Sequence, residues 1–127
     1  MPVERKLISK SDSLPFSTAV VYGDLVFISG AVGRNPETGR MAADVAEQTR
    51  VTMELIQQRL QEAGSSLEMA LKITIFLTDM NLFAEMNSAY RQFFHNGFPA
   101  RSCVQVGALP DKEAVVEIEV MAGKVTA

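Results

Sequence analysis

An arginine and a pair of glutamates stand in two successive segments that the sequence predicts to be strands. Arg101 opens the first segment, and Glu117 and Glu119 lie in the second. Side chains two residues apart share a face of a strand, so Arg101 shares its face with Cys103 and Gln105, and the two glutamates share theirs. If the strands pair, a guanidinium, a thiol and two carboxylates meet on one side of a sheet. Such a group can bind a small carboxylate and place a water beside it.

The bulk composition excludes several classes of function. The chain has 127 residues, which predicts a single domain over 1–127, and its formal net charge is -3. This balance argues against nucleic acid as a partner. No apolar run approaches the roughly 20 residues of a membrane span, so we expect no membrane partner. With one cysteine and no apolar leader in the first residues, we expect a cytoplasmic protein.

The scarcity of histidine and cysteine limits the chemistry further. His95 and Cys103 are the only residues of their types, so one chain cannot supply the usual zinc ligands, and we expect no metal site. His95 follows two phenylalanines near the predicted end of a helix, where a structural role is favoured. The sequence contains no GxGxxG or P-loop pattern, which argues against nucleotide cofactors. Chemistry must therefore depend on arginine, carboxylates, hydroxyls, main-chain groups and water.

Periodicity and turn residues predict the order β-β-α-β-α-β-β. The expected segments are strands at 18–22 and 25–29, a helix capped by Asp44 and Gly64, a strand at 70–78, a helix at 82–94, and strands at 101–106 and 115–122. Gly30 is expected to end the second strand. In the first helix one stripe is expected to be buried (Val45, Thr49, Thr52, Ile56, Leu60 and Ala63), while Gln48 is expected to be solvated. In the second helix the apolar stripe is expected to belong to the core (Leu82, Met86, Ala89, Tyr90 and Phe93).

Two helices separated by one strand pack most simply on one face of a mixed sheet, which leaves the other face bare. That face is expected to be too polar for a core and too apolar for a free surface, and we expect a second subunit to cover it. Its expected residues are Lys72, Thr74, Phe76, Cys103, Gln105, Glu117, Glu119 and Met121.

Motifs along nearly the whole chain resemble the Rid proteins, the reactive intermediate deaminases of the RidA/YjgF group. The matching pieces are Leu14-Pro15-Phe16-Ser17-Thr18-Ala19-Val20, Val26-Phe27-Ile28-Ser29-Gly30, Glu47-Gln48-Thr49-Arg50, Ala63-Gly64-Ser65-Ser66-Leu67, Lys72 to Met80, Asn87 with Tyr90, Phe98-Pro99-Ala100-Arg101-Ser102 and Val116-Glu117-Ile118-Glu119. The resemblance implies a chorismate-mutase-like α+β fold and a homotrimer with active clefts between subunits. It implies cofactor-independent hydrolysis of 2-iminobutanoate- and 2-iminopropanoate-type imines, and of enamines such as 2-aminoacrylate, to 2-oxo acids and ammonia.

The resemblance also assigns roles to individual residues. Arg101 matches the arginine that binds the substrate carboxylate, and Glu117 matches the residue that positions the attacking water and handles its proton. Ser29, Gly30 and Cys103 match residues of the cleft. Without the resemblance, Arg101 could belong to an ion pair between subunits, and Glu117 could simply neutralise the Arg101 charge. Ser29 could be a hydroxyl at the end of a strand with no role in a site. Arg101 could also lower the pKa of the Cys103 thiol, although a wall residue is the favoured interpretation.

Asn87 and Phe16 match two further positions around the cleft, and Phe16 is a departure from the family pattern. Many RidA-like sequences carry a tyrosine there, so the ring is kept and the hydroxyl is lost. Ala31 stands where glutamine is common, and Gly33 stands near a frequent proline. Phe16 and Ala31 keep open an alternative function, a small-carboxylate binding or regulatory protein with little turnover. A third interpretation, an endoribonuclease or translation inhibitor, is disfavoured by the acidic balance.

Overall fold

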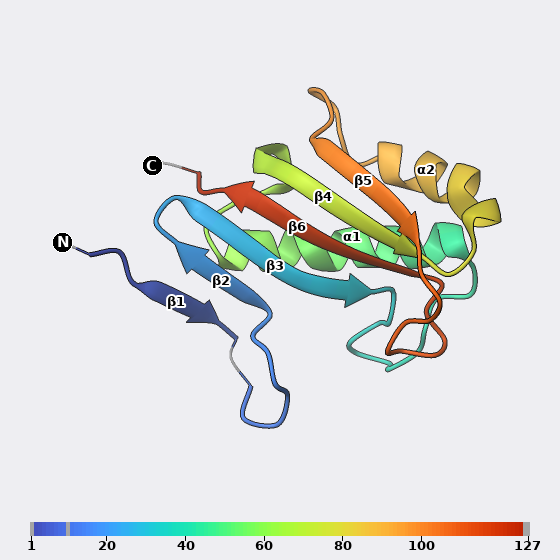
Figure 1. Cartoon of the computed structure of the whole chain (residues 1–127), viewed down its shortest axis with the longest axis horizontal. Coiled ribbons are helices and arrows are strands. Elements are labelled where there is room, and N and C mark those ends of the chain that lie inside the picture. The colour runs from blue at the N-terminus through green and yellow to red at the C-terminus, as the bar shows by residue number, and fades with distance from the viewer. Residues whose placement is uncertain (1, 10, 126–127) are drawn as a thin grey trace.

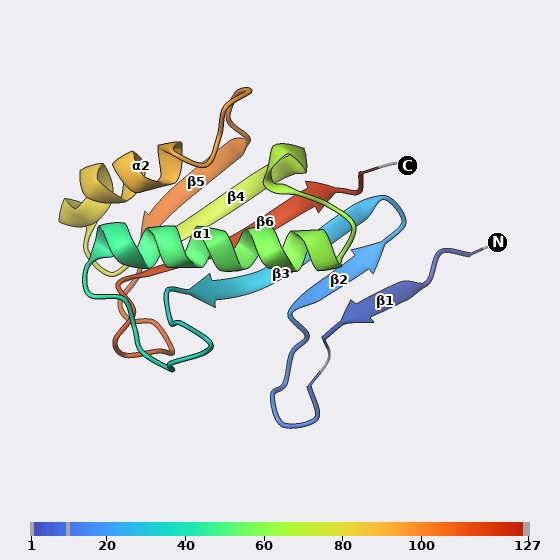
Figure 2. The same cartoon turned by 180° about the vertical axis from the view of Figure 1, so that it is seen from behind.

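Two helices lie on one face of a single sheet, as the sequence predicts (Figures 1 and 2). The sheet has six strands, one more than the sequence predicts. The computed structural model describes residues 2–9 and 11–125. Two short 3-10 helices, Leu67–Met69 and Met80–Leu82, precede β4 and α2. The elements are β1 (Arg5–Ile8), β2 (Ala19–Tyr22), β3 (Leu25–Val32), α1 (Val45–Glu62), β4 (Ala70–Leu77), α2 (Phe83–Arg91), β5 (Ala100–Gln105) and β6 (Val116–Gly123).

The strand order is β1-β2-β3-β6-β4-β5, with β4 and β5 parallel and every other neighbouring pair antiparallel. The last strand thus inserts between β3 and β4, and the strand of Arg101 forms an edge (Figure 1). The pairing of β5 with β6 that was considered from the sequence does not occur, because β4 separates the two strands. β1 was not predicted, because a strand of four residues with two cations shows too little alternation to be recognised.

Helix α1 has the start and stop signals that the sequence indicates. The Asp44 carboxylate accepts a hydrogen bond from the Glu47 N–H at 2.9 Å, and Gly64 takes a left-handed φ of +84° just beyond the Ala63 cap. The predicted stripe is buried, and the helix packs on β3 and β6. Gln48, expected to be solvated, is only 3% exposed, because its amide bonds to two neighbouring loops.

Helix α2 ends at Arg91, earlier than the predicted 94. The N–H groups of Phe93 and Phe94 bond back three residues, to the carbonyls of Tyr90 and Arg91, so the last turn tightens and the helix stops. His95 consequently lies in the loop before β5 rather than on a helix. None of the helices in the described part of the chain is long and apolar enough to cross a bilayer.

Candidate active site

Arg101 is fixed beneath α2 by three contacts. Arg101 pairs with Ile73 of β4, so its side chain shares the helix-facing side of the sheet. Its Nη1 donates to the Asn87 Oδ1 at 2.7 Å. Its guanidinium carbon lies 4.8 Å from the ring centroid of Tyr90 and 5.6 Å from that of Phe83. Sequence reasoning placed Tyr90 in the core, where it is, and did not identify Phe83 as a neighbour of Arg101.

The Arg101 charge has no acidic partner within residues 2–9 and 11–125. The ion pairs found there join Arg34 to Asp111 and Glu113, and Arg50 to Glu47 and Glu54. Arg101 instead lines a pocket of about 230 Å³ whose wall residues include no carboxylate: Asn87, Tyr90, Arg91, Phe98, Pro99 and Arg101. A half-buried guanidinium in such a pocket is suited to bind an anion.

Cys103 lies on the same side of β5 as Arg101, since it pairs with Ile75 of β4. The thiol packs against the hydrophobic core and is half-buried. Burial raises its pKa, and the opposing effect of Arg101 is smaller. The alternative of a lowered thiol pKa is disfavoured, because desolvation outweighs the effect of the cation. This environment favours a wall residue over a nucleophile.

Glu117 lies on the other face of the sheet, close against the main chain of Gly30. A Cβ added at Gly30 would be 2.7 Å from the Glu117 Oε2. Burial raises the pKa of the Glu117 carboxyl, and the neighbouring Glu119 charge raises it further. β3 continues past Gly30 to Val32, with a register irregularity between Ile28 and Ala31. Gly30 therefore marks a bend that admits the carboxylate, not the end of the strand.

The two groups expected to meet on one face lie on opposite faces of one chain. Arg101 pairs with Ile73 of β4 and Glu117 pairs with Phe76 of the same strand. Ile73 and Phe76 are an odd number of residues apart, so their partners point to opposite sides. The prediction of a shared face is thus wrong for a single chain, and Cys103 and Gln105 are likewise absent from the open face. The structure divides the predicted site into two halves.

Ser29 joins the Glu117 half to the segment that carries Phe16. Its Oγ donates to the Ser17 carbonyl at 2.6 Å, and its N–H donates to the Thr18 carbonyl at 3.0 Å. The hydroxyl predicted to line the cleft is thus engaged in holding this loop against β3. Phe16 itself is 52% exposed, so its ring lies at the surface beside this half of the site.

The open face of the sheet carries both polar and apolar side chains, as the sequence predicts, although Cys103 and Gln105 lie on the opposite face. Beside the glutamates it carries large apolar side chains that face no helix. Phe27 and Met121 are cross-strand partners and are 36% and 39% exposed. Val104, the partner of Phe76, is 43% exposed. A sheet face of this kind is typical of a surface that another molecule covers.

Fold and site define a small α+β protein with an arginine-lined pocket on one face of its sheet and a half-buried carboxylate on the other. The sequence profile of the family described as Endoribonuclease L-PSP matches residues 10–124. The chain belongs to this family, which relatives also name the RutC, YjgF or Rid family.

Similar sequences and solved structures agree with this assignment. The chain is 40% identical to the 2-iminobutanoate/2-iminopropanoate deaminase of Escherichia coli K12 over 111 residues, which cover 85% of this chain and 86% of that protein. It is 40% identical to a RutC family protein of Pyrococcus abyssi over 87% of each chain. The crystal structure of E. coli TdcF with bound serine superposes with a TM-score of 0.87 at 37% identity, covering 94% of this chain and 99% of TdcF. The yeast protein YEO7 gives a TM-score of 0.88 at 31% identity, with coverages of 96% and 100%.

Proposed function

We propose that the protein is a cofactor-independent deaminase that hydrolyses 2-imino acids, and their enamine tautomers, to 2-oxo acids and ammonia. The observation that carries the proposal is how Arg101 is held. Its guanidinium contacts Asn87 and two aromatic rings, and one edge is left for an anion. The identity to a 2-iminobutanoate/2-iminopropanoate deaminase supports this choice of reaction.

In the proposed reaction Arg101 binds the carboxylate of the substrate and so places the adjacent iminium carbon. An enamine first takes a proton on its terminal carbon to become the iminium ion. Glu117 accepts a proton from a water whose oxygen bonds to the iminium carbon, which gives a carbinolamine. Glu117 returns this proton to the nitrogen, and the C–N bond breaks as ammonia leaves. The hydroxyl oxygen becomes the carbonyl of the 2-oxo acid and gives its own proton to the Glu117 carboxylate, from which the proton passes to ammonia or solvent. Glu117 must be ionised to begin this sequence, and its raised pKa makes it a stronger base than an ordinary glutamate.

We also propose that the chain works as a homotrimer whose sites form between subunits. Arg101, Asn87 and Cys103 of one copy would face Glu117, Gly30 and the Ser29–Phe16 segment of the next. Two features support this arrangement: the opposite orientation of Arg101 and Glu117 in one chain, and the exposed apolar side chains of the open face. A cyclic assembly buries that face and joins the halves with the same contact repeated.

The reaction is tested by measuring ammonia release from imines generated in situ by an amino-acid oxidase. We expect Arg101→Ala to lose activity about a hundredfold or more, because the carboxylate loses a charge-assisted bond. Arg40→Ala, which changes an exposed arginine in the loop before α1, serves as the matched control. Undiminished activity of a folded Arg101→Ala protein would contradict the mechanism.

The shared site is tested by mixing two inactive variants, Arg101→Ala and Glu117→Gln, after dissociation and reassembly. In a cyclic trimer each mixed assembly contains one cleft with both native residues, so roughly a quarter of the native rate should return. If both residues of a site belonged to the same chain, mixing would restore nothing. Sedimentation of the unmixed variants verifies that each still assembles.

A small-carboxylate binding protein with little turnover is the second candidate. The bound serine in the TdcF structure shows that a relative holds a small amino acid, and Phe16 lacks the hydroxyl common at its position. Tight binding of 2-oxo acids without acceleration of imine hydrolysis by the native protein would favour this function. Ribonuclease activity, which the family description names, is disfavoured by the formal net charge of -3.

A further inference from the structure

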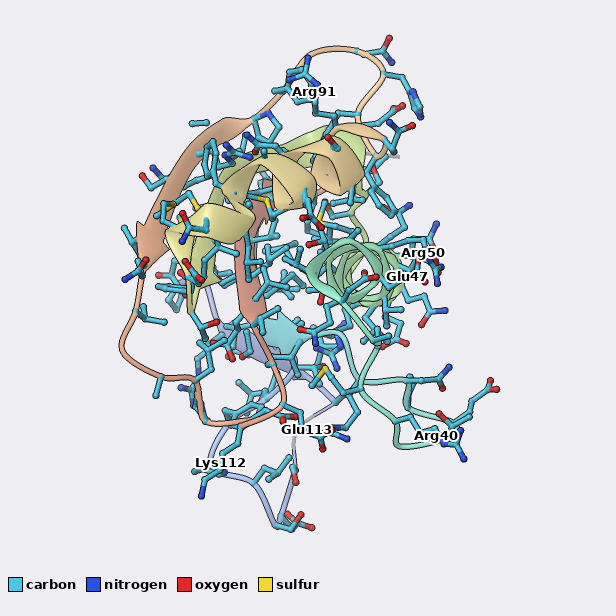
Figure 3. The ribbon with its side chains drawn as sticks, turned by 90° about the vertical axis from the view of Figure 1, so that its right-hand side faces the viewer. Arg40, Glu47, Arg50, Arg91, Lys112 and Glu113 are labelled. Atoms are coloured by element: carbon cyan, nitrogen blue, oxygen red, sulfur yellow. The ribbon has the colours of Figure 1, made fainter. Side chains whose placement is uncertain are left out.

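The pocket that contains Arg101 holds a second guanidinium, that of Arg91. Arg91 is the last residue of α2. In Figure 3 its label stands where the loop from α2 passes towards β5. A basic residue in the last turn of a helix is common, since it interacts favourably with the helix dipole. The placement of this one, in the wall of the same pocket as Arg101, goes beyond that role.

Each of the two guanidinium groups rests on an aromatic ring, and the two rings are stacked. The guanidinium carbon of Arg91 lies 5.2 Å from the ring centroid of Phe98, and that of Arg101 lies 4.8 Å from the Tyr90 centroid. The Tyr90 and Phe98 centroids are 6.5 Å apart with the ring planes at 17°. Both cations are therefore anchored to one aromatic pair. Preorganised cations lose less conformational entropy when an anion binds.

The positive charge of this pocket is local. The chain as a whole is acidic, with a formal net charge of -3. Within residues 2–9 and 11–125, however, the pocket wall has no carboxylate, and neither Arg91 nor Arg101 takes part in an ion pair. In the proposed trimer Glu117 of the partner subunit faces Arg101, which leaves Arg91 as the cation of this pocket with no acidic partner in the described chain. A ligand whose first carboxylate binds Arg101 and whose second reaches Arg91 gains an attraction that a ligand with one carboxylate lacks.

We propose that Arg91 makes the site selective for 2-imino acids that carry a second carboxylate on their side chain, as in 2-iminosuccinate and 2-iminoglutarate. Arg101 takes the carboxylate beside the imine, and Arg91 takes the distal one. The inference rests on the deaminase proposed above. Enzymes that oxidise the α-carbon–nitrogen bond of acidic amino acids by two electrons would supply such imines.

Binding of the product acids tests this selectivity without requiring turnover. We expect calorimetry on the assembled native protein to show 2-oxoglutarate binding about tenfold more tightly than 2-oxobutanoate, with the difference shrinking at high salt. Arg91→Gln should remove the preference and change the 2-oxobutanoate affinity less than about twofold. Arg40→Gln, an exposed arginine that Figure 3 shows at the far end of the molecule, should change neither affinity.

Two results would overturn the inference: a native protein that binds the two acids equally, or an Arg91→Gln protein that loses affinity for both alike. Arg91→Lys retains the charge and should keep part of the preference, which separates a charge effect from damage to the helix end. Deamination assays then judge the proposed function independently. A protein that prefers 2-oxoglutarate but accelerates no imine hydrolysis would refute the deaminase proposal and leave the selectivity of the pocket established.

Discussion

The carboxylate of Glu117 occupies the space that a side chain at Gly30 would need. A Cβ at Gly30 would lie 2.7 Å from the Glu117 Oε2 and 3.0 Å from its Cδ. These atoms are at the far end of a flexible side chain, so the carboxylate, not the backbone, would move. Gly30 therefore determines where the proposed base sits.

Gly30→Ala is expected to reduce kcat about tenfold while lowering stability by only about 1 kcal/mol, because displacing a base affects proton transfer more than it affects packing. Gly33→Ala is the contrasting variant. There the Cβ would lie 2.6 Å from both the Cα and the carbonyl oxygen of Gln48, and neither α1 backbone atom can rotate away. We expect Gly33→Ala to destabilise the protein by several kcal/mol. Urea unfolding and steady-state kinetics of both variants distinguish the two effects, and equal stability losses would contradict this distinction.

The pH dependence of the reaction should report the Glu117 carboxyl. Its pKa is raised first by burial and then by the Glu119 charge, so activity should fall on acidification at a pH above that of an ordinary glutamate. Glu119→Gln removes the repulsion and should move the acid limb of the kcat/KM profile to lower pH. A limb that stays in place would mean that another group controls the rate.

The raised pKa of the Glu117 carboxyl should also make the folded protein less stable when this group is ionised. A folded-state pKa above the unfolded value contributes stability below the unfolded pKa, and this contribution is lost as pH rises through the folded pKa. At neutral pH the ionised, partly desolvated Glu117 therefore costs stability. Glu117→Gln should raise the melting temperature by about 1–3 °C at pH 7, and the difference should vanish at a pH below the unfolded value. A Glu117→Gln protein that melts lower at pH 7 would show that the carboxylate is stabilised by a partner.

Asn87 is expected to act through Arg101. Its Oδ1 accepts the Nη1 hydrogen at 2.7 Å, so Asn87→Ala frees one edge of the guanidinium while leaving both rings in place. We expect KM to rise about tenfold with kcat changed less, because a less fixed Arg101 binds the substrate carboxylate more weakly and takes no direct part in proton transfer. Ser88→Ala, one residue further along α2, is the control, since its hydroxyl bonds only to the Ala84 carbonyl in the described chain. A drop in kcat alone would assign Asn87 a different role.

The sequence was sufficient for both helices and for every strand except β1, but not for the order in which the strands pair. Helix α1 could be predicted because a cap, an apolar period and a glycine stop agree over the same residues. That β6 inserts between β3 and β4 has no local signal, because strand order depends on contacts between distant segments. The error in placing Arg101 and Glu117 on one face follows directly from the missing strand between them.

Side-chain partners were the second limit of the sequence. The sequence predicts that the apolar stripe of α2, which includes Tyr90, is core. The contacts of the Tyr90 ring with Phe98 and with Arg101 depend on the packing of β5 against α2, which the sequence does not indicate. Gln48 was expected to be solvated because glutamine is usually exposed, and only the fold reveals the two loops that it joins.

Gln48 is the buried polar group that connects these loops. Its Nε2 donates to the carbonyls of Ala42 and Glu113 at 3.1 and 3.2 Å, and its Oε1 accepts from the Val115 N–H at 2.9 Å. Gln48→Leu keeps the volume but leaves these main-chain groups without their partner, so we expect a loss of about 3 kcal/mol. Gln58→Leu on the exposed side of α1 should cost well under 1 kcal/mol. Urea unfolding compares them, and Gln48→Glu adds a discriminating case, since a carboxylate can still accept from Val115 but cannot donate to the two carbonyls. An equal cost for Gln48→Leu and Gln58→Leu would show that water replaces the amide and that the loops are held by other contacts.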